Sequence, residues 1–562
     1  MRGIDTMSAS SKKKLRKELA AEMLTEKQRQ EKKEAKKLKA MTISFVAIML
    51  VIAIVFSVVL VDNGINRSGY FQKKTIAATV NKQDLNSVQV NYYLTDYIKN
   101  IYSQWQSQYG DNLSVMLGFM GMDANKSLDE QIYDKESGQT FADYYLGEAL
   151  AKAKSDYALY NKAMAEGFKL SEDEQKAMDS NLSMMDLYAQ LYGYKNADKF
   201  LQATYGYGST LASYTEYTKI STIASAFYSK YSADLKYDDA AIRGYEKGKE
   251  NNFTSFSYAT YTLTADDFLP EKSKDEEKKE PTAEETAAAL KKAEEAINSL
   301  KDAKNLEELN KLIGALEINK DSKDPVTSQA RTDLLYPQIA SNLQSWLADK
   351  ARVENEITVV AEETTSKDKD GKDVKTTTGY TVVLFQARNE NTQKLANVRH
   401  LLVAFEGGST ATDGSKTYSD AEKKKAKEQA EKLLKEWEDG KKTEDSFVEL
   451  VKKHTKDDAS KETGGLYEDI HPKSNYVPNF LNWCIDSNRK VGDTGIIQSE
   501  YGYHIMYFSS YDELTYRDYM IREEMRTNDV EEWYNKTLEG TSTAVGNTKY
   551  LNMDIVLASL GS

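Results

Sequence analysis

The sequence predicts a multidomain α+β fold: a single N-terminal transmembrane helix, a helical region, two copies of one α+β domain and a C-terminal helix. Three observations lead to this prediction. Residues 40–61 are apolar and uncharged, residues 88–249 show helical spacing of apolar side chains, and a strand–helix–strand plan occurs twice after residue 250. The chain has 562 residues, 40% hydrophobic and 29% charged, which suffices for several domains with apolar cores and polar surfaces.

Residues 40–61 predict an uncleaved, single-pass membrane anchor. A helix of this length spans about 30 Å of hydrocarbon. The first 40 residues carry 13 Lys and Arg against six Asp and Glu, so the basic tail at 1–39 is expected in the cytoplasm, touching anionic lipid, with the rest outside. A cleaved signal peptide fits less well, because the basic and apolar stretches are too long and no A-x-A site follows. No cysteine follows that could carry a lipoprotein anchor.

Charge and cysteine content exclude several classes of function. The net charge of −13 argues against a nucleic-acid partner. Cys484 is the single cysteine, so no internal disulfide and no C-x-x-C redox or zinc motif can form. Its apolar neighbours favour a buried packing role over a nucleophile. An exported chain without disulfides fits a bacterium best.

Residues 62–250 are expected to form a helical domain. A linker at 63–75 precedes a short strand at 76–80, and a helix follows over 88–101. Ser171 and Glu174 form a candidate capping box at the start of a later helix. Tyrosines recur at helical spacing, which is more typical of packing than of ligand binding.

The segments 251–390 and 396–511 share one plan. In the first, a strand at 253–268 and a solvated charge run at 271–285 precede helices at 293–300 and 306–312, then strands at 357–363 and 379–388 joined by a polar loop at 364–378. In the second, a strand at 397–407 precedes helices at 421–437 and 446–454, then strands at 494–499 and 502–508. Trp346 and Trp483 each stand thirteen residues before a strand residue, Val359 and Ile496. Each final strand opens with Gly-Tyr, which indicates an internal duplication.

The last segment, 512–562, is predicted to contain a helix at 514–538. The apolar run at 550–560 is expected to dock on another part of the protein.

The four histidines all fall in the second copy, which indicates that this copy alone keeps a functional site. His400 and His504 occupy matching places in two strands, so adjacent strands of one sheet could bring the imidazoles side by side. The first copy has Thr381 at the second of these places. His454 and His471 are interpreted as core residues. Carboxylates at ligand spacing are absent around His400 and His504, so we expect no metal and no cofactor.

Residues 397–510 resemble the parvulin family of peptidyl-prolyl isomerases. The ordered motifs are Arg399-His400-Leu401-Leu402-Val403, Thr455-Lys456-Asp457, Gly464-Gly465, Val477-Pro478-Asn479-Phe480, Val491-Gly492-Asp493-Thr494-Gly495 and Tyr501-Gly502-Tyr503-His504-Ile505-Met506. The wider layout resembles SurA-type and PrsA-type foldases, in which a helical chaperone region is combined with one or two parvulin domains. The resemblance identifies 396–511 as the isomerase domain and 251–390 as a degenerate copy.

The resemblance also implies roles for individual residues. His400 and His504 would be the paired histidines of the site, and Asp457 would stand at the loop position that is Cys or Asp in relatives. The pocket for the proline ring would be lined by Leu466, Tyr476 and Phe480. The chain departs from the family in two places: Leu466-Tyr467-Glu468 replaces the usual D-L-G after the glycine pair, and Tyr476 replaces a methionine.

The function that the resemblance implies is isomerisation of X–Pro bonds in unfolded or newly exported polypeptides, combined with chaperone activity. Rotation about a peptide bond faces a barrier of about 18–20 kcal/mol, and no covalent step is needed to lower it. Two alternatives stay open. The chain could hold unfolded clients with inactive parvulin domains, or it could be a scaffold in the cell envelope.

Overall fold

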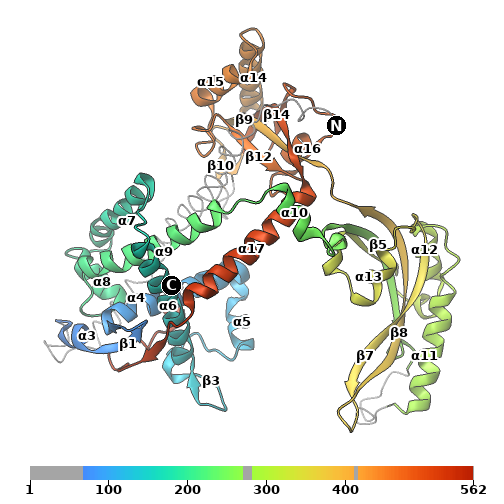
Figure 1. Ribbon diagram of the computed structural model, residues 1–562, viewed down its shortest axis with the longest axis horizontal. Helices are drawn as coiled ribbons and strands as arrows, with labels where there is room; N and C mark the ends of the chain where they lie inside the picture. The colour runs from blue at the N-terminus through green and yellow to red at the C-terminus, as the bar shows by residue number, and fades with distance from the viewer. Residues whose placement is uncertain (1–67, 270–280, 411–415, 561–562) are drawn as a thin grey trace. The chain divides into compact units, whose positions relative to one another are not determined.

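The computed structural model describes residues 68–269, 281–410 and 416–560, shown in Figure 1. These residues divide into two compact units. Residues 68–236 and 526–560 are here called the helical unit, and residues 237–525 the sheet unit. The predicted basic tail and membrane helix, 1–61, lie outside the described residues. Within the described part of the chain, no helix is long and apolar enough to cross a bilayer.

The helical unit consists mainly of α-helices. Its elements are α3 (Tyr70–Lys74), β1 (Ile76–Val80), β2 (Gln83–Asn86), α4 (Ser87–Tyr109), α5 (Leu113–Phe119), β3 (Ile132–Asp134), β4 (Gln139–Thr140), α6 (Phe141–Ala165), α7 (Glu172–Leu191), α8 (Ala197–Tyr205), α9 (Leu211–Asp234) and β15 (Thr543–Val545). Strand β1 and the capping box of Ser171 and Glu174 confirm the predictions from the sequence. The predicted linker instead contains α3, which begins after Gly69 in the left-handed conformation, with a φ of 71°.

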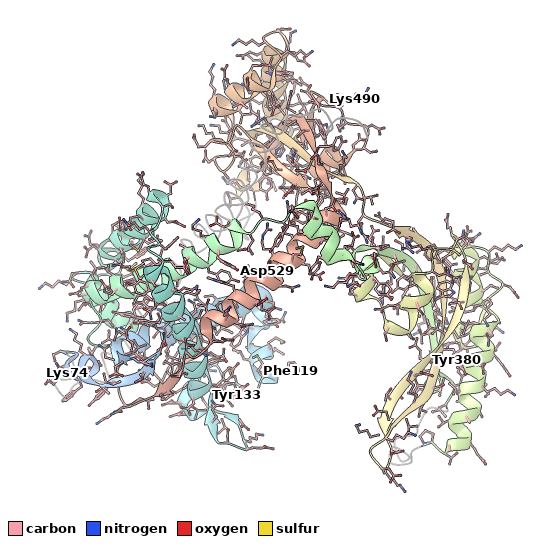
Figure 2. All side chains as sticks on the ribbon, in the orientation of Figure 1. Lys74, Phe119, Tyr133, Tyr380, Lys490 and Asp529 are labelled. Carbon is pink, nitrogen blue, oxygen red and sulfur yellow. The ribbon has the colours of Figure 1, made fainter. Side chains whose placement is uncertain are left out.

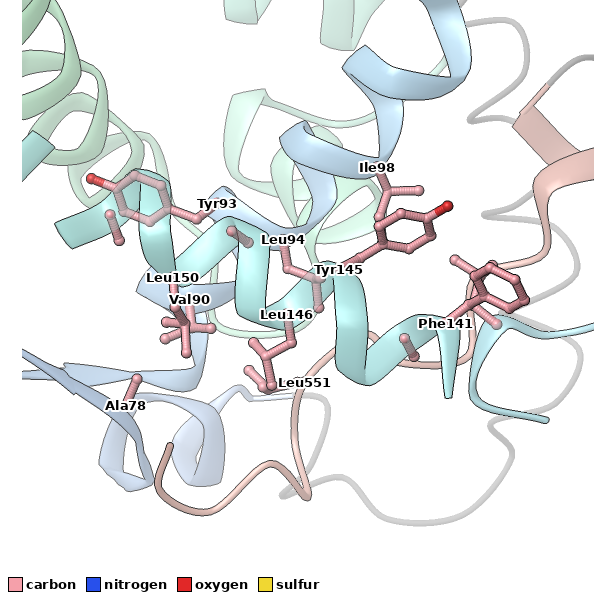
Figure 3. Packing of buried hydrophobic residues seen from close by; sticks show 14 of the residues in the cluster. Ala78, Val90, Tyr93, Leu94, Ile98, Phe141, Tyr145, Leu146, Leu150 and Leu551 are labelled. Atoms are coloured by element: carbon pink, nitrogen blue, oxygen red, sulfur yellow. The ribbon is translucent and has the colours of Figure 1, made fainter. Parts of the chain in front are cut away.

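The core of the helical unit forms where α4 packs on α6. Val90 and Leu94 of α4 face Leu146 and Leu150 of α6, as Figure 3 shows. Leu551, from the C-terminal segment, is buried in the same cluster. Strand β15 pairs antiparallel with β1. The C-terminal segment therefore completes the core of the helical unit, which confirms the prediction that the apolar run at 550–560 docks.

The sheet unit contains two four-stranded sheets. The elements of the first part are α10 (Asp239–Glu246), β5 (Ser255–Thr264), α11 (Ala283–Asn298), α12 (Leu306–Ala315), β6 (Gln329–Leu335), α13 (Ser341–Leu347), β7 (Ile357–Lys367) and β8 (Asp373–Asn389). The strand order is β6-β5-β8-β7. Helices α11 and α12 cover one face of this sheet, and α13 covers the other.

The second sheet repeats this arrangement. Its elements are β9 (Lys394–Ala404), β10 (Ser409–Thr410), β11 (Lys416–Thr417), α14 (Asp420–Glu438), α15 (Glu444–His454), β12 (Leu466–Ile470), α16 (Pro478–Ile485), β13 (Thr494–Gln498) and β14 (Gly502–Thr515). Strands β10 and β11 form a separate two-stranded sheet. The order of the four-stranded sheet is β12-β9-β14-β13, so the second, first, fourth and third strands of each four-stranded sheet lie side by side in both parts. Helices α14 and α15 cover one face and α16 covers the other.

The two parts also share a local motif of sequence W-x-x-D-x-x-R, which begins near the C-terminal end of α13 in the first part and of α16 in the second. Arg352 lies over the ring of Trp346 at 4.1 Å, and Arg489 lies over Trp483 at 4.3 Å. In each pair the guanidinium Nε donates to the backbone oxygen of the tryptophan, at 3.2 and 3.1 Å. The arginine follows the tryptophan by six residues in both copies, a spacing that is visible in the sequence alone.

Two boundaries differ from the sequence predictions. The prediction of a polar loop at 364–378 is wrong, because β7 extends to Lys367 and β8 begins at Asp373. Threonine is β-branched and suits extended backbone, so the Thr-rich stretches pair across the hairpin despite their polarity. Helix α11 begins ten residues before the expected position, because the Thr282 side chain caps it. The predicted C-terminal helix is confirmed as α17 (Tyr516–Leu538).

Candidate active site

The candidate site lies on the face of the second sheet that α16 covers. His400 is on β9, and its backbone pairs with Met506; His504, two residues earlier on β14, pairs with Leu402. The two histidines are therefore diagonal neighbours on adjacent strands. Their Nδ1 atoms lie 3.1 Å apart, and both side chains are buried. The structure thus brings together the pair that the sequence predicted.

A chain of hydrogen bonds runs through this pair. At one end His400 Nε2 lies 3.0 Å from Asp457 Oδ2, and at the other His504 Nε2 lies 2.8 Å from Ser499 Oγ. Asp457 Oδ2 also accepts from the hydroxyl of Ser460 and, at 3.1 Å, from that of Tyr467. Three donors therefore converge on one carboxylate oxygen.

The partners determine the direction of the chain. An ionised carboxylate only accepts, so His400 Nε2 carries a hydrogen and donates to Asp457. His400 Nδ1 then accepts from His504 Nδ1, which leaves His504 Nε2 to accept from Ser499. Ser499 Oγ in turn accepts from the backbone N–H of Tyr501. Both imidazoles are neutral in this arrangement, and the donors all point toward Asp457.

Burial keeps His504 neutral. Loss of water around the ring lowers the pKa of His504 to about 3; His400 adds to this effect and Asp457 opposes it. Burial also lowers the pKa of His471, at the end of β12, to about 4, where its ring stacks on Tyr516. His471 therefore takes part in the packing of the domain, as the sequence predicted.

The loop that carries Asp457 is held against β9. Thr455 Oγ1 accepts from the backbone N–H groups of Leu402 and Asp457, at 3.1 and 3.2 Å. The Lys456 N–H donates to the Leu402 carbonyl at 2.9 Å. Gly465, after the loop, accepts from the N–H of His400 at 2.9 Å. The threonine and the glycine thus determine where the carboxylate meets the histidine.

Aromatic rings form the wall beside the histidines. Phe480, on α16, is buried, with its ring centroid 5.4 Å from that of His400 and 5.7 Å from that of His504. Tyr476 lies 5.2 Å from Phe480, and Tyr467 lies 4.7 Å from His400. The structure therefore places two of the three predicted pocket residues, Tyr476 and Phe480, at the site.

Leu466 lies elsewhere. It pairs with Arg399, whose guanidinium reaches Glu444 on α15, and so faces the side covered by α14 and α15. Successive residues of a strand point to opposite faces, which brings Tyr467 rather than Leu466 to the histidines. The structure does not bring Leu466 to the site, and the register of β12 is the reason.

Sequence reasoning missed Ser460, Tyr467 and Ser499. Ser460 and Ser499 lie in loops without a strong sequence pattern. The departure from the family motif at Tyr467 is visible in the sequence, but by itself it does not indicate a role in the site. The short spacing from Asp457 to Ser460 and from Ser499 to His504 is the signal that could have found the two serines.

The first sheet has no counterpart of this site among its described residues. In register, Thr381 takes the place of His504, and Thr260 takes that of His400. The hydroxyl of Thr381 lies 2.7 Å from that of Thr262. Two threonines cannot form the directed chain that the imidazoles form.

No group of three or more His, Cys, Asp or Glu side chains in the described ranges could hold a metal ion. A cavity of about 370 Å³ is lined by residues of the helical unit alone. Cys484 is buried, and burial raises the pKa of its thiol, so it packs in the core as predicted.

The histidines predict how stability depends on pH. The pKa values of His504 and His471 are both lower in the folded chain than the usual 6.5, so the unfolded chain binds more protons below pH 6.5. The stabilisation is complete above pH 6.5 and is lost as the pH falls toward 4. We expect the urea midpoint of the domain to fall between pH 7 and 4.5, and to fall less in His471→Phe, which keeps the stacked ring. Equal slopes in wild type and variant would contradict this assignment.

Residues 400–510 match the family described as Rotamase, PPIC-type PPIASE domain. No curated protein matches the chain. Similar solved structures include the peptidylprolyl isomerase PrsA from Bacillus anthracis, 22% identical over 27% of this chain and 59% of that one, with a TM-score of 0.17. PrsA from Bacillus cereus is 24% identical, over 26% of this chain and 49% of that one, with a TM-score of 0.17. PrsA from Bacillus subtilis is 20% identical, over 26% of this chain and 50% of that one, with a TM-score of 0.18. The chain thus covers 49% to 59% of their length.

Proposed function

Because the chain carries a parvulin-type peptidyl-prolyl cis-trans isomerase domain at residues 400–510, we propose that it is a membrane-anchored, extracytoplasmic isomerase and chaperone for newly exported polypeptides. The hydrogen-bonded chain through His400 and His504, beside an aromatic wall, is the observation that carries the isomerase part. The anchor at 40–61 and the outside location rest on the apolar run and its basic flank.

The proposed mechanism is noncovalent. Phe480 and Tyr476 hold the proline ring and remove water from the X–Pro amide. The twisted amide has lost its double-bond character and is less polar at oxygen, so an apolar wall with neutral imidazoles favours it over the planar ground state. By accepting a hydrogen bond from His400, Asp457 fixes the tautomers of both histidines, and these tautomers determine the polarity of the site.

The segment 251–390 is proposed to be a degenerate copy of the isomerase domain. The shared strand order and the repeated tryptophan–arginine motif support this relationship. Thr260 and Thr381 at the places of the histidines support a structural or peptide-binding role without catalysis.

The helical unit is proposed to hold unfolded clients. Phe119 is 82% exposed on α5, and the apolar Tyr133 on β3 is also exposed (Figure 2). The cavity of about 370 Å³ is lined by tyrosines, Val88 and Ile220, with Lys73 and Glu216 among its polar residues. In this proposal an unfolded client would contact these exposed side chains. A holdase without catalysis is the second candidate, favoured by the departures from the family at Tyr467 and Tyr476.

One experiment tests location and activity together. Membranes from cells that make the full chain are washed with carbonate, and exchange of a short Ala-Pro peptide is followed by NMR. We expect the wild-type chain to stay in the pellet and to accelerate exchange, and His504→Ala to stay in the pellet with slower exchange. A chain released by carbonate would refute the anchor, and wild-type membranes without acceleration would leave holding of clients as the function.

A further inference from the structure

Tyr467 makes two kinds of contact in the site. Its hydroxyl donates to Asp457 Oδ2 at 3.1 Å, at the end of the hydrogen-bonded chain. Its ring meets that of His400 edge to face, with centroids 4.7 Å apart and an interplanar angle of 71°. The register of β12 against β9, which pairs Tyr467 with Val398, puts both contacts on the histidine face.

The hydroxyl acts on the carboxylate that orients His400. Asp457 Oδ2 accepts from His400, Ser460 and Tyr467, and each of these bonds restricts where the oxygen lies. Hydrogen bonds to a charged acceptor are among the stronger ones in proteins, so loss of one donor loosens the carboxylate. Because His400 donates to the same oxygen, its ring and tautomer depend on that position.

The ring completes a cluster of three aromatic side chains. The centroids of Tyr467 and Tyr476 are 5.5 Å apart, and both rings lie within 5.7 Å of Phe480. Tyr467 and Tyr476 are partly exposed, whereas Phe480 is buried, so the two tyrosines supply the accessible part of the wall. An aliphatic side chain at residue 467 would offer neither the flat ring nor the hydroxyl.

We propose that Tyr467 both selects the substrate, through a ring that binds proline, and positions the site, through a hydroxyl that holds Asp457 against His400. This proposal rests on the proposed isomerase function. It separates two effects of one side chain: the ring determines how tightly the X–Pro peptide binds, and the hydroxyl determines how fast the bound peptide exchanges.

Two variants of the full chain separate these effects. Exchange rates of an Ala-Pro peptide are measured by NMR over a range of peptide concentrations, in detergent. We expect Tyr467→Phe to lower kcat about tenfold with KM unchanged within twofold, because one bond to a charged acceptor is lost. We expect Tyr467→Leu to lower kcat similarly and to raise KM about fivefold, because the ring is lost as well. The thermal midpoint of each variant confirms folding.

Tyr503→Phe is the matched control. Its hydroxyl donates to Gln498, and its ring packs with Phe405 on the other face of the same sheet. We expect kcat and KM of this variant to stay within twofold of wild type. A Tyr467→Phe variant with unchanged kcat would overturn the positioning role, and equal KM in the Phe and Leu variants would overturn the role of the ring.

A second measurement keeps the proposal testable if the wild-type chain does not accelerate exchange. The ¹⁵N shifts of the imidazole of His400 report its tautomer and its bond to Asp457, and titration with the peptide gives its Kd. We expect Tyr467→Phe to move the His400 shifts and Tyr467→Leu to weaken the Kd about fivefold. Wild-type inactivity with these changes would refute the isomerase function alone, and their absence would refute the role of Tyr467.

Discussion

Replacing Gly465 by alanine is expected to destabilise the isomerase domain by more than about 3 kcal/mol and to abolish its activity. Gly465 has a φ of +74°, a conformation that costs an L-residue about 1–2 kcal/mol. An added Cβ would also overlap the backbone oxygen of His400. Gly465 directly precedes β12 and His400 lies on β9, so the overlap can be removed only if β12 moves away from β9. That movement breaks the hydrogen bond from the His400 N–H to the Gly465 carbonyl oxygen. Urea unfolding of the full chain, followed by signals of the domain, measures the loss.

Gly492→Ala is the matched control for this prediction. Gly492 also has a positive φ, of +90°, but an added Cβ there meets nothing within 4 Å. Its cost is therefore limited to backbone strain, about 1–2 kcal/mol, and the site should keep its activity. Equal losses of stability in the two variants would mean that overlap with His400 contributes nothing.

Replacing Asp457 by asparagine is expected to lower kcat/KM about tenfold or more, and replacing it by alanine to lower it about a hundredfold. The carboxylate is the acceptor for three donors, and each bond to a charged group contributes about 1.5–3 kcal/mol. An amide keeps one acceptor but removes the charge, so it no longer dictates the tautomer of His400. NMR exchange of an Ala-Pro peptide measures the effect.

Asp458→Asn provides the control for removal of charge, because Asp458 is the next residue in the same loop and is exposed. We expect this variant to keep the wild-type rate within twofold. If Asp457→Asn is equally active, the hydrogen-bonded chain does not contribute to the reaction, and the aromatic wall alone would have to account for isomerisation.

Much of the second part of the sheet unit could be predicted because its signals are local. The strand patterns around His400 and His504, the glycine pair and the Val-Pro-x-Phe helix start each occupy a few neighbouring residues. The glycine pair shows the physical reason for such a motif, since the left-handed backbone and the contact with His400 both require the absence of a Cβ. The polarity of residues 364–378 suggests a loop, but the β-branched residues of this stretch pair across β7 and β8.

The sequence by itself predicted which side chains form the candidate site: the histidine pair, Asp457 and Phe480. The tertiary structure decided how they meet. His400 and His504 are 104 positions apart in the chain, and the register of β9 against β14 sets their contact at 3.1 Å. The register of β12 likewise places Tyr467, and not Leu466, on the histidine face of the sheet, because a shift of one residue exchanges the two faces of a strand. Periodicity predicts that a strand has two faces, but only packing against α15 and α16 decides which residue lies on each.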